Sequence, residues 1–380
     1  MQRIAVPPRE DWPERAAELG FAFHTIDGQP YWTETAAYAL SAAEVDALED
    51  AAQALEDICL DFVGETIERG DYEGFGLSET AIALVEDSWN RQDKNLYGRF
   101  DLAFGADGAP KLLEYNADTP TALFEASVVQ WEWLEHHFPQ RDQFNSIHET
   151  LVEAWQHFGL YGHRLHFACV RNHAEDEGTV DYLRDTAMQA GVDAERLFID
   201  EIGWNGRRFV DMTNQPITML FKLYPWEWLM AEDFAAHIGP SGIRMIEPAW
   251  KMLLSTKALL PKLWARHAEH PNLLPASFAP GDIEGAMVRK PLLGREGAGV
   301  TLFDAQGREI LSAAPNTATG GTDGAAAFVY QQAVELQSFD GHYPMLGAWV
   351  VASRACGLGI REDDTAITRN SSRFVPHFFQ

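Results

Sequence analysis

Residues 97–116 alternate between apolar and polar side chains on either side of a short break, and this pattern predicts a β-hairpin. The break, Gly105–Pro110, contains an Asp-Gly pair, which is typical of a tight turn. Successive residues of a strand point to opposite faces, so Arg99 and Asp101 share one face of the first strand. A sheet that carries an arginine and an acid among apolar residues suggests either ion pairing or a binding site.

The second strand of the hairpin also carries polar side chains on one face, because Glu114 and Asn116 are two residues apart. Pairing Phe104 with Lys111 across the turn would place the two acids directly opposite each other, and the arginine opposite the asparagine. A shift of one residue would move these groups onto different faces. The register therefore decides whether the four polar side chains form a cluster.

Helical spacing of apolar residues dominates the chain before the hairpin. The segment 41–70 begins with Ser41 and has Glu44 three residues later, which is the pattern of a capping box. After the hairpin, residues 121–138 predict a second helix that begins directly after Pro120. The first part of the chain is thus predicted to combine helices with the hairpin.

Strands and helices alternate from about residue 160, beginning with the apolar strand 164–170 and the amphipathic helix 178–192. This alternation predicts a small parallel α/β domain. From residue 251 the pattern changes again, to a helix followed by strands that are joined by a glycine-rich turn. We therefore expect a mixed fold, partly α+β and partly α/β, whose segments are 1–158, 159–250, 251–335 and 336–380.

Composition argues against several classes of function. The formal net charge of −28 over 380 residues argues against binding to nucleic acid or to anionic membrane surfaces. The three cysteines are widely spaced and predict neither a zinc site nor a disulfide framework. No apolar run approaches the length of a membrane span, and the first ten residues lack the core of a secretory signal. We expect a cytoplasmic protein, and its oligomeric state stays open.

The polar face of the hairpin has two interpretations. Two opposing carboxylates repel each other, and a hard cation such as Mg²⁺, which takes oxygen ligands, would reverse that effect. Arg99 would then hold a phosphate that the metal also contacts. The alternative is a solvated face on which Arg99 pairs with Asp101 or Glu114, since surface ion pairs are common and weak.

Residues after 250 could bind phosphate. Lys290 is followed by a glycine-rich turn that contains Arg295, and glycines let backbone amides approach a phosphate closely. Lys257 lies near the start of a predicted helix, and the strand before Gln331 could present backbone groups to an adenine. Each feature also has an ordinary structural explanation: a flexible turn, an exposed lysine and a strand end. Arg354 and Arg361, in an otherwise apolar region, each need an anionic partner, either a structural carboxylate or a phosphate. Together these features are typical of phosphoryl transfer.

Several motifs together resemble those of the glutathionylspermidine synthase family, and the likeness extends over nearly the whole chain. They include "YGRFDLAF", "KLLEYNADTPTALFEASVVQW", "VRKPLLGREGAGV" and "RACGLGIRED". The resemblance implies an ATP-grasp fold in permuted order, with an inserted pre-ATP-grasp domain at 159–250. The amidase half of the bifunctional members has no counterpart here.

The resemblance also implies roles for individual residues. Arg99 would contact phosphate, Mg²⁺ (two ions) would bind Asp101, Glu114 and Asn116, and Arg354 would lie beside the reacting carboxylate. The implied ATP-binding residues are Arg99, Lys257, Lys290, Arg295, Glu296, Gly297, Gln331, Gln332, Ala333 and Val334, and the implied substrate-binding residues are Thr119, Thr121, Glu175, Asp176 and Glu177. Leu223 stands where a hydrogen-bonding threonine is expected in glutathione-binding members, which argues against glutathione as the acid.

The implied reaction joins a carboxylic acid to an amine through an acyl phosphate, at the expense of ATP. Arg99, Arg295 and Arg354 would be its catalytic residues. Two other interpretations remain open at this point: a non-catalytic ATP-grasp protein that binds nucleotide or polyamine, and a kinase that releases a stable phosphorylated product.

Overall fold

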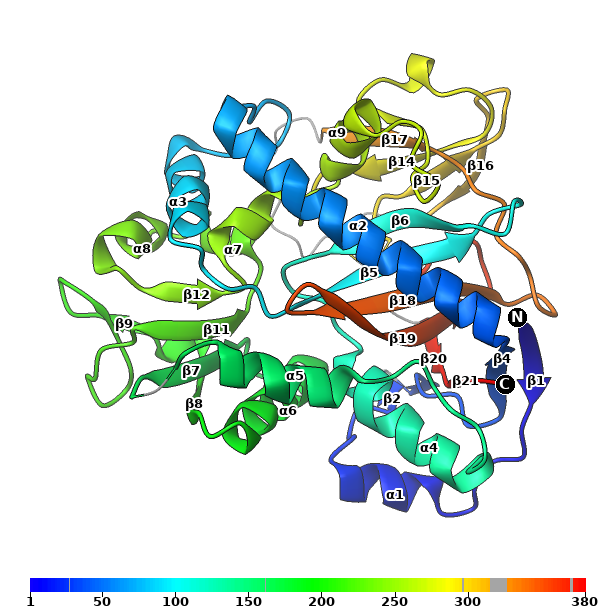
Figure 1. Cartoon of the computed structure of the whole chain (residues 1–380), viewed down its shortest axis with the longest axis horizontal. Helices are drawn as coiled ribbons and strands as arrows, with labels where there is room; N and C mark the ends of the chain where they lie inside the picture. The colour runs from blue at the N-terminus through cyan, green and yellow to red at the C-terminus, as the bar shows by residue number, and fades with distance from the viewer. Residues whose placement is uncertain (27, 161, 296, 315–326, 370–371) are drawn as a thin grey trace.

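The protein is described by a computed structural model that covers residues 1–380 except 27, 161, 296, 315–326 and 370–371 (Figure 1). Its central element is an antiparallel five-stranded sheet in the order β20-β19-β18-β5-β6. The first and last parts of the chain build this sheet together: β5 (Tyr97–Phe104), β6 (Pro110–Asn116), β18 (Tyr343–Val351), β19 (Arg354–Asp363) and β20 (Arg373–Val375).

The hairpin β5–β6 confirms the alignment of the four polar side chains but not the pairing assumed at the turn. Asp101 lies opposite Glu114 and Arg99 opposite Asn116. Next to the turn, however, Phe104 pairs with Pro110 rather than with Lys111. The register shifts by one residue between Asp101 and Leu102, as in a β-bulge, and this shift restores the polar pairs.

One face of the central sheet is covered by the long helix α2 (Ala42–Arg69), which crosses it diagonally in Figure 1. Phe100 and Leu102 point to this face and are fully buried in the same core as the apolar side of α2. Ser41 caps the helix, and its capping box with Glu44 is confirmed. Because side chains alternate along β5, Arg99 and Asp101 lie on the opposite face.

A four-stranded parallel sheet lies beside the central sheet, in the order β12-β11-β7-β8, and the predicted parallel pairing is confirmed. Its strands are β7 (Arg164–Cys169), β8 (Asp193–Phe198), β11 (Met219–Leu223) and β12 (Arg244–Ile246). Helix α6 (Ala174–Gln189) packs on β7 and β8. The helices α7 (Trp226–Leu229) and α8 (Ala235–Ser241) and the short hairpin β9 (Gly203–Trp204) and β10 (Phe209–Val210) complete this region.

Buried ion pairs attach the parallel sheet to the segments that flank the hairpin. Lys222 on β11 bonds Asp118 at 2.7 Å, just after β6, and both side chains are 1% exposed. Glu247 bonds Lys251 at 2.7 Å and accepts the backbone amide of Tyr97 at the start of β5. A buried charge without its partner is strongly destabilising, so these pairs fix the position of the loop after β6.

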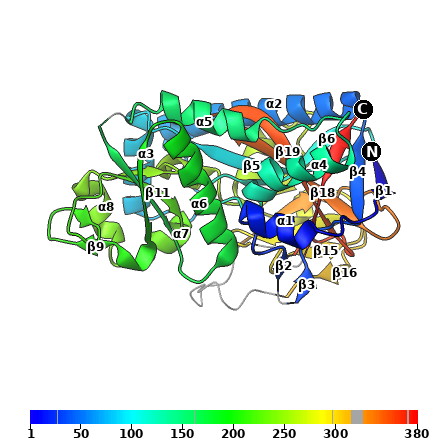
Figure 2. The same ribbon diagram turned by 90° about the horizontal axis from the view of Figure 1, so that it is seen from below.

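The third sheet is antiparallel, in the order β13-β17-β14-β15-β16. Its strands are β13 (Ala276–Ser277), β14 (Met287–Pro291), β15 (Thr301–Phe303), β16 (Glu309–Ser312) and β17 (Phe328–Gln332). Figure 2 shows β15 and β16 on the side of the molecule opposite to α2 and α5 (Ile147–His157). This sheet therefore lies over the polar face of the central hairpin and not over its apolar face.

The remaining elements lie around these sheets. A small sheet in the order β1-β4-β21 brings the two termini together (Figure 1), and β2 pairs with β3. The bounds of these strands are β1 (Gln2–Ala5), β2 (Thr25–Ile26), β3 (Gln29–Pro30), β4 (Ala36–Leu40) and β21 (His377–Phe379), and the other helices are α1 (Trp12–Leu19), α3 (Glu79–Asn90), α4 (Gln130–His137) and α9 (Leu259–Arg266).

Two predicted helix boundaries differ from the structure. The helix expected directly after Pro120 starts later, because Ala122 has a φ of 67° and lies outside the helical conformation. It also contains a π-helical turn, η1 (Glu125–Val129), before α4. Lys257 precedes α9 rather than lying inside it. Among the described residues, no helix combines the length and the apolar character needed to cross a membrane.

Candidate active site

A cavity of about 500 Å³ lies between the polar face of the hairpin, the antiparallel sheet β13–β17 and the C-terminal segment. Residues that are far apart in the sequence meet here. The predicted site residues that line the cavity are Arg99, Asp101, Glu114, Asn116, Thr119, Thr121, Lys290, Arg295, Gly297, Gln331, Gln332, Ala333 and Val334.

Arg99, Asp101 and Asn116 form one hydrogen-bonded group at the floor of the cavity. The Arg99 guanidinium bonds the Asp101 carboxylate at 2.6 Å and donates to the carbonyl of Thr121 at 2.6 Å. Asn116 donates to the same carboxylate at 2.9 Å. Arg99 and Asp101 are 7% and 8% exposed, so the pair is buried and not the solvated pair of the alternative interpretation. Gly347 on β18 makes room for it, because a Cβ there would lie 2.8 Å from the Arg99 side chain.

Two lysines approach the hairpin from the antiparallel sheet and the segment before α9. Lys257 bonds Glu114 at 2.6 Å and the carbonyl of Gly294 at 2.6 Å. Lys290 donates to the carbonyl of Leu113 at 2.6 Å. Burial alone would raise the pKa of Glu114, but the charges of Lys257 and Lys290 outweigh burial and hold that pKa below its usual range. Burial lowers the pKa of Lys290 to about 8.

The strand β17 connects the lysines to the predicted adenine site. Gln331 accepts a hydrogen bond from Lys290 at 2.7 Å and donates to the carbonyl of Leu112 at 2.8 Å. Gln331 is therefore a buried structural connection between β17 and the hairpin. Gln332, the last residue of β17, and the following Ala333 and Val334 line the cavity.

The glycine-rich turn between β14 and β15 also contacts the cavity. Arg295 bonds Glu227 of α7 at 3.1 Å and donates to the Thr119 hydroxyl at 2.7 Å. Gly297 has a φ of 69°, and a Cβ there would lie 2.3 Å from the carbonyl of Thr368. Only glycine fits this contact between the turn and the C-terminal segment. Glu296, predicted to be part of the same turn, lies outside the described residues.

The donor set on the hairpin suits a hard cation. Asp101, Glu114 and Asn116 supply carboxylate and amide oxygens from neighbouring strands, which is the chemistry that Mg²⁺ prefers. Within the described ranges, however, no group of three or more His, Cys, Asp or Glu side chains is arranged to hold a metal ion. In the part of the chain that the structure describes, the protein supplies only these two carboxylates and one amide oxygen at this place. The residues therefore fit a cation whose remaining ligands come from a bound anion.

Thr119, Thr121 and Arg361 also line the cavity. Glu175, in the first turn of α6, lies near Thr121, which acts to lower the pKa of this carboxyl against the larger effect of burial. Asp176 and Glu177 have other partners: Asp176 pairs with His173 at 3.2 Å, and Glu177 pairs with Arg196 at 2.9 Å. The described residues that line the cavity include none of the acidic triplet 175–177, and Glu175 is the member that lies near one of them.

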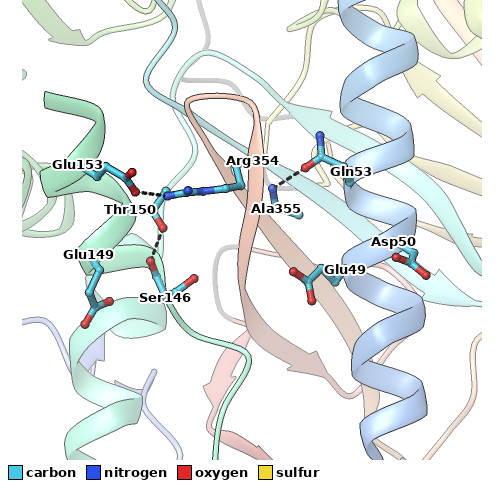
Figure 3. Close-up of a pocket in the computed structure, with 9 residues that line it drawn as sticks. All are labelled: Glu49, Asp50, Gln53, Ser146, Glu149, Thr150, Glu153, Arg354 and Ala355. Carbon is cyan, nitrogen blue, oxygen red and sulfur yellow. Dashed lines mark hydrogen bonds and ion pairs between the residues drawn. The ribbon is translucent and has the colours of Figure 1, made fainter. Parts of the chain in front are cut away.

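The structure does not place Arg354 at this cavity. Arg354 lies at the tip of the β18–β19 hairpin, where it bonds Glu153 of α5 at 2.6 Å and is 54% exposed (Figure 3). It lines a different, open cleft, together with the acids Glu49, Asp50 and Glu149. The anionic partner predicted for Arg354 is therefore a structural carboxylate, and its expected place beside the reacting groups is wrong.

Comparison with known proteins identifies the family. The model of the glutathionylspermidine synthase preATP-grasp family matches residues 3–380. The chain belongs to the glutathionylspermidine synthase family.

Relatives of this family member are ligases and synthetases that act on small molecules. A Haemophilus influenzae protein described as a "putative acid–amine ligase" is 46% identical, and the match covers the whole of both chains. Trypanothione synthetase of Crithidia fasciculata is 29% identical over 79% of this chain and 50% of its own length. The bifunctional glutathionylspermidine synthetase/amidase of Escherichia coli is 25% identical over 76% and 50%. The chain thus spans about half the length of the last two relatives.

The fold also has a solved neighbour. The glutathione synthetase-like effector GSS30 of Globodera pallida, in its apo form, aligns with a TM-score of 0.58 and 11% identity. The alignment covers 99% of this chain and 100% of that one. This similarity shows a mixed α/β fold of the glutathione synthetase type.

In this family member Leu223 does not face the cavity. It is 3% exposed and packs in the second hydrophobic core, which it shares with Phe221 of the same strand. Leu223 is therefore a core residue and is not among the described residues that line the cavity.

The sequence did not reveal two residues near the cavity, and a third was noticed without a role at the site. Glu227 was not considered, although a glutamate next to Trp226 and Trp228 in a short helix has no obvious core role. Glu125 was placed in the helix predicted over residues 121–138, and the structure buries it completely. Arg361 was noticed as an arginine in an apolar strand, and this signal was valid, but Arg354 was chosen in its place.

Proposed function

We propose that this protein is an ATP-dependent acid–amine ligase that forms an amide through an acyl phosphate. The observation that carries the proposal is the cavity itself: Lys257, Lys290 and Arg99 lie next to the carboxylates of Asp101 and Glu114, and Arg295 and the loop 119–121 also line the cavity. Phosphoryl transfer depends mainly on positioning and on neutralising charge, which such a set of side chains supports.

The proposed fold is ATP-grasp in permuted order, with segment 159–250 as an inserted pre-ATP-grasp domain. Its support is the order of parts along the chain. The oxygen donors of the hairpin come early, and the lysines and the adenine-binding strand come late, although both groups meet at one cavity.

ATP would lie with its adenine against Gln332 to Val334 and its phosphates toward Lys257 and Lys290. Asp101, Glu114 and Asn116 would hold Mg²⁺, which we propose binds as two ions. When bound, the metal supplies charge neutralisation for the phosphates. Lys257 and Glu114 form an ion pair here, so the positive charge of the lysine neutralises the negative charge of the carboxylate.

In the first step, a carboxylate oxygen of the acid substrate attacks the γ-phosphorus of ATP, and ADP leaves. Arg99 and Arg295 offset the charge on the transferring phosphoryl group. For Arg295 this requires it to exchange its present partners, Glu227 and Thr119, for phosphate oxygens.

In the second step, the lone pair of an amine attacks the acyl carbon, a proton leaves the nitrogen, and phosphate departs as the carbonyl reforms. Arg361 is proposed as the group that stabilises the oxyanion, in place of Arg354, because it lines the cavity beside Thr121. The acid is a small peptide such as glutathione, and the amine is a polyamine such as spermidine.

Phosphate release from Mg·ATP tests this function, with a matrix of small peptides and polyamines that includes glutathione and spermidine. The proposal predicts release that requires both an acid and an amine, together with an amide product detected by mass spectrometry. Nucleotide binding without ADP formation for any pair would contradict it and favour a non-catalytic binder. Release without an amine, with a stable phosphorylated product, would indicate a kinase.

A further inference from the structure

A buried carboxyl group lies behind the substrate end of the cavity and has no assigned role. Glu125 is 0% exposed, in the π-helical turn η1 that follows the loop 119–121. Its Oε1 accepts a hydrogen bond from the Tyr31 hydroxyl at 2.6 Å. Its Oε2 is buried and has no hydrogen-bond partner among the described residues. A half-satisfied buried carboxyl group is costly, and protonation removes the charge that makes it so.

Glu125 is connected to the cavity through charge. Glu175, half-buried on α6, lies near Thr121, which lowers the pKa of Glu175, lines the cavity and contacts Arg99 through its carbonyl. Arg361 lines the cavity, and its guanidinium lies 6.0 Å from the centre of the Tyr31 ring. Two carboxyl groups therefore share one nearby guanidinium.

This arrangement favours one proton on the pair of carboxyl groups. Burial and the charge of Glu175 raise the pKa of Glu125 to about 8, and Tyr31 and Arg361 only partly oppose the rise. Burial also raises the pKa of Glu175, whereas Arg361 and Thr121 act in the opposite direction. The titratable groups that face the pair are thus the neutral phenol of Tyr31 and the guanidinium of Arg361, with Asp176 and His173 beside Glu175. Glu175, which lies near the cavity residue Thr121, is the better placed of the two to be ionised.

We propose that Glu125 is a positioning residue that holds a proton while the amine site is empty and releases it when a cationic amine binds beside Glu175. The choice of a polyamine as the bound amine rests on the proposed function. An ammonium group near the pair favours the ionised form of both carboxyls, and the proton of Glu125 passes to solvent. The second negative charge then strengthens the hold on the cation.

The proposal predicts that binding of a polyamine releases protons. Spermidine is titrated calorimetrically into the full chain with Mg²⁺ and a non-hydrolysable ATP analogue at pH 7, in two buffers of different ionisation enthalpy. Wild type is expected to release about one proton per amine bound, and its affinity should rise by up to about tenfold per pH unit between pH 6 and 8. Glu125→Gln should release about none and lose this pH dependence.

A matched control exists on α2. Glu56 is also 0% exposed, and it accepts a hydrogen bond from the Tyr115 hydroxyl at 2.8 Å. Its other oxygen has no partner in the described part of the chain, but Glu56 lies on the opposite face of the hairpin from the cavity. Glu56→Gln should keep the proton release of wild type. Equal release from Glu125→Gln and wild type would overturn the proposal, because another group would then supply the proton.

A second measurement separates this proposal from the proposed function. Infrared difference spectra of the protein without substrate should show a protonated carboxyl band that disappears between pH 7 and 9, is absent in Glu125→Gln and moves to higher pH in Tyr31→Phe. The last shift is expected because the Tyr31 hydroxyl lowers the pKa of Glu125. If spermidine does not bind, the proposed amine is wrong, but the infrared measurement still tests the protonation of Glu125. If the band is missing from wild type, the role of Glu125 fails whatever the substrate.

Discussion

Arg354 and Arg361 lie on the same strand, β19, but serve different ends of the molecule. Arg361 lines the large cavity. It lies two residues after Gly359, which pairs with Gly347 of β18, and Gly347 in turn pairs with Asp101 of β5. Arg354 lies seven residues before Arg361, roughly 20 Å along an extended strand, and pairs with Glu153. The two arginines therefore form a natural comparison.

Replacing Arg361 should abolish turnover, and replacing Arg354 should not. Loss of one oxyanion or phosphate contact typically lowers the rate by about 10²–10³, so Arg361→Ala is expected to lose at least this factor in kcat. Arg354→Ala removes a mostly exposed ion pair and should stay within about twofold of wild type. Phosphate release under saturating substrates measures both variants. A larger loss for Arg354→Ala than for Arg361→Ala would reverse the assignment.

The hairpin carboxylates should be required for Mg²⁺-dependent ADP formation. Asp101→Asn and Glu114→Gln keep the size of the side chain and remove the charge, so each is expected to raise the Mg²⁺ concentration needed for half-maximal rate by at least about tenfold, as losses of metal ligands and their supporting contacts commonly do. Thermal denaturation should accompany the assay, because Asp101→Asn leaves Arg99 buried without its carboxylate.

Asp107 provides the control for these variants, since it is an exposed acid in the turn of the same hairpin, paired with Lys111. Asp107→Asn should leave both the rate and its Mg²⁺ dependence unchanged. Unchanged Mg·ATP turnover in either Asp101→Asn or Glu114→Gln would refute the proposed metal ligands.

The sequence predicted which polar side chains of the hairpin share a face, but it did not predict the pairing next to the turn. The alternation around Asp101 and Glu114 predicted their shared face, and the prediction was correct even though the assumed pairing of Phe104 was not. A bulge is invisible to periodicity, because it changes the register without changing which residues are apolar. Here it happened to restore the predicted pairs.

The choice between Arg354 and Arg361 could not be made from spacing. Both lie in one apolar, glycine-containing run, and the start of β19 at residue 354 became visible only in the structure. Glu125 was hidden for a related reason: a glutamate at helical spacing suggests solvent exposure, and only tertiary packing with Tyr31 shows that it is buried. Contacts between segments that are distant in the chain could therefore not be predicted from the local pattern of the sequence.

Glu227 should act as a competitor for Arg295 when nucleotide is absent. The ion pair at 3.1 Å is half-exposed, with side chains 32% and 24% accessible, so it is worth at most about 1 kcal/mol. Glu227→Gln is expected to free Arg295 for phosphate and to tighten ATP binding up to about fivefold. Arg295→Ala should weaken it. Calorimetric titration of the ATP analogue with Mg²⁺ compares the variants, and weaker binding by both would indicate that Glu227 instead holds Arg295 in its working position.

The buried carboxyl of Glu125 should also make folding stability depend on pH. Its pKa is raised from 4.5 to about 8 in the folded chain, so between these values the folded state holds a proton that the unfolded state has lost. Stability from this group is therefore fully present below pH 4.5 and declines as pH rises through about 8. Glu247, whose pKa is also raised by burial, adds a slope of the same sign, which the difference between wild type and Glu125→Gln removes. The slope of Glu175 belongs to the same pair of carboxyl groups and is measured together with that of Glu125. From pH 5.5 to 8.5, the free energy of unfolding measured in urea should fall by at least about 1 kcal/mol more for wild type than for Glu125→Gln. Equal slopes for the two proteins would show that Glu125 is already ionised at neutral pH, which would contradict its proposed role as a proton donor.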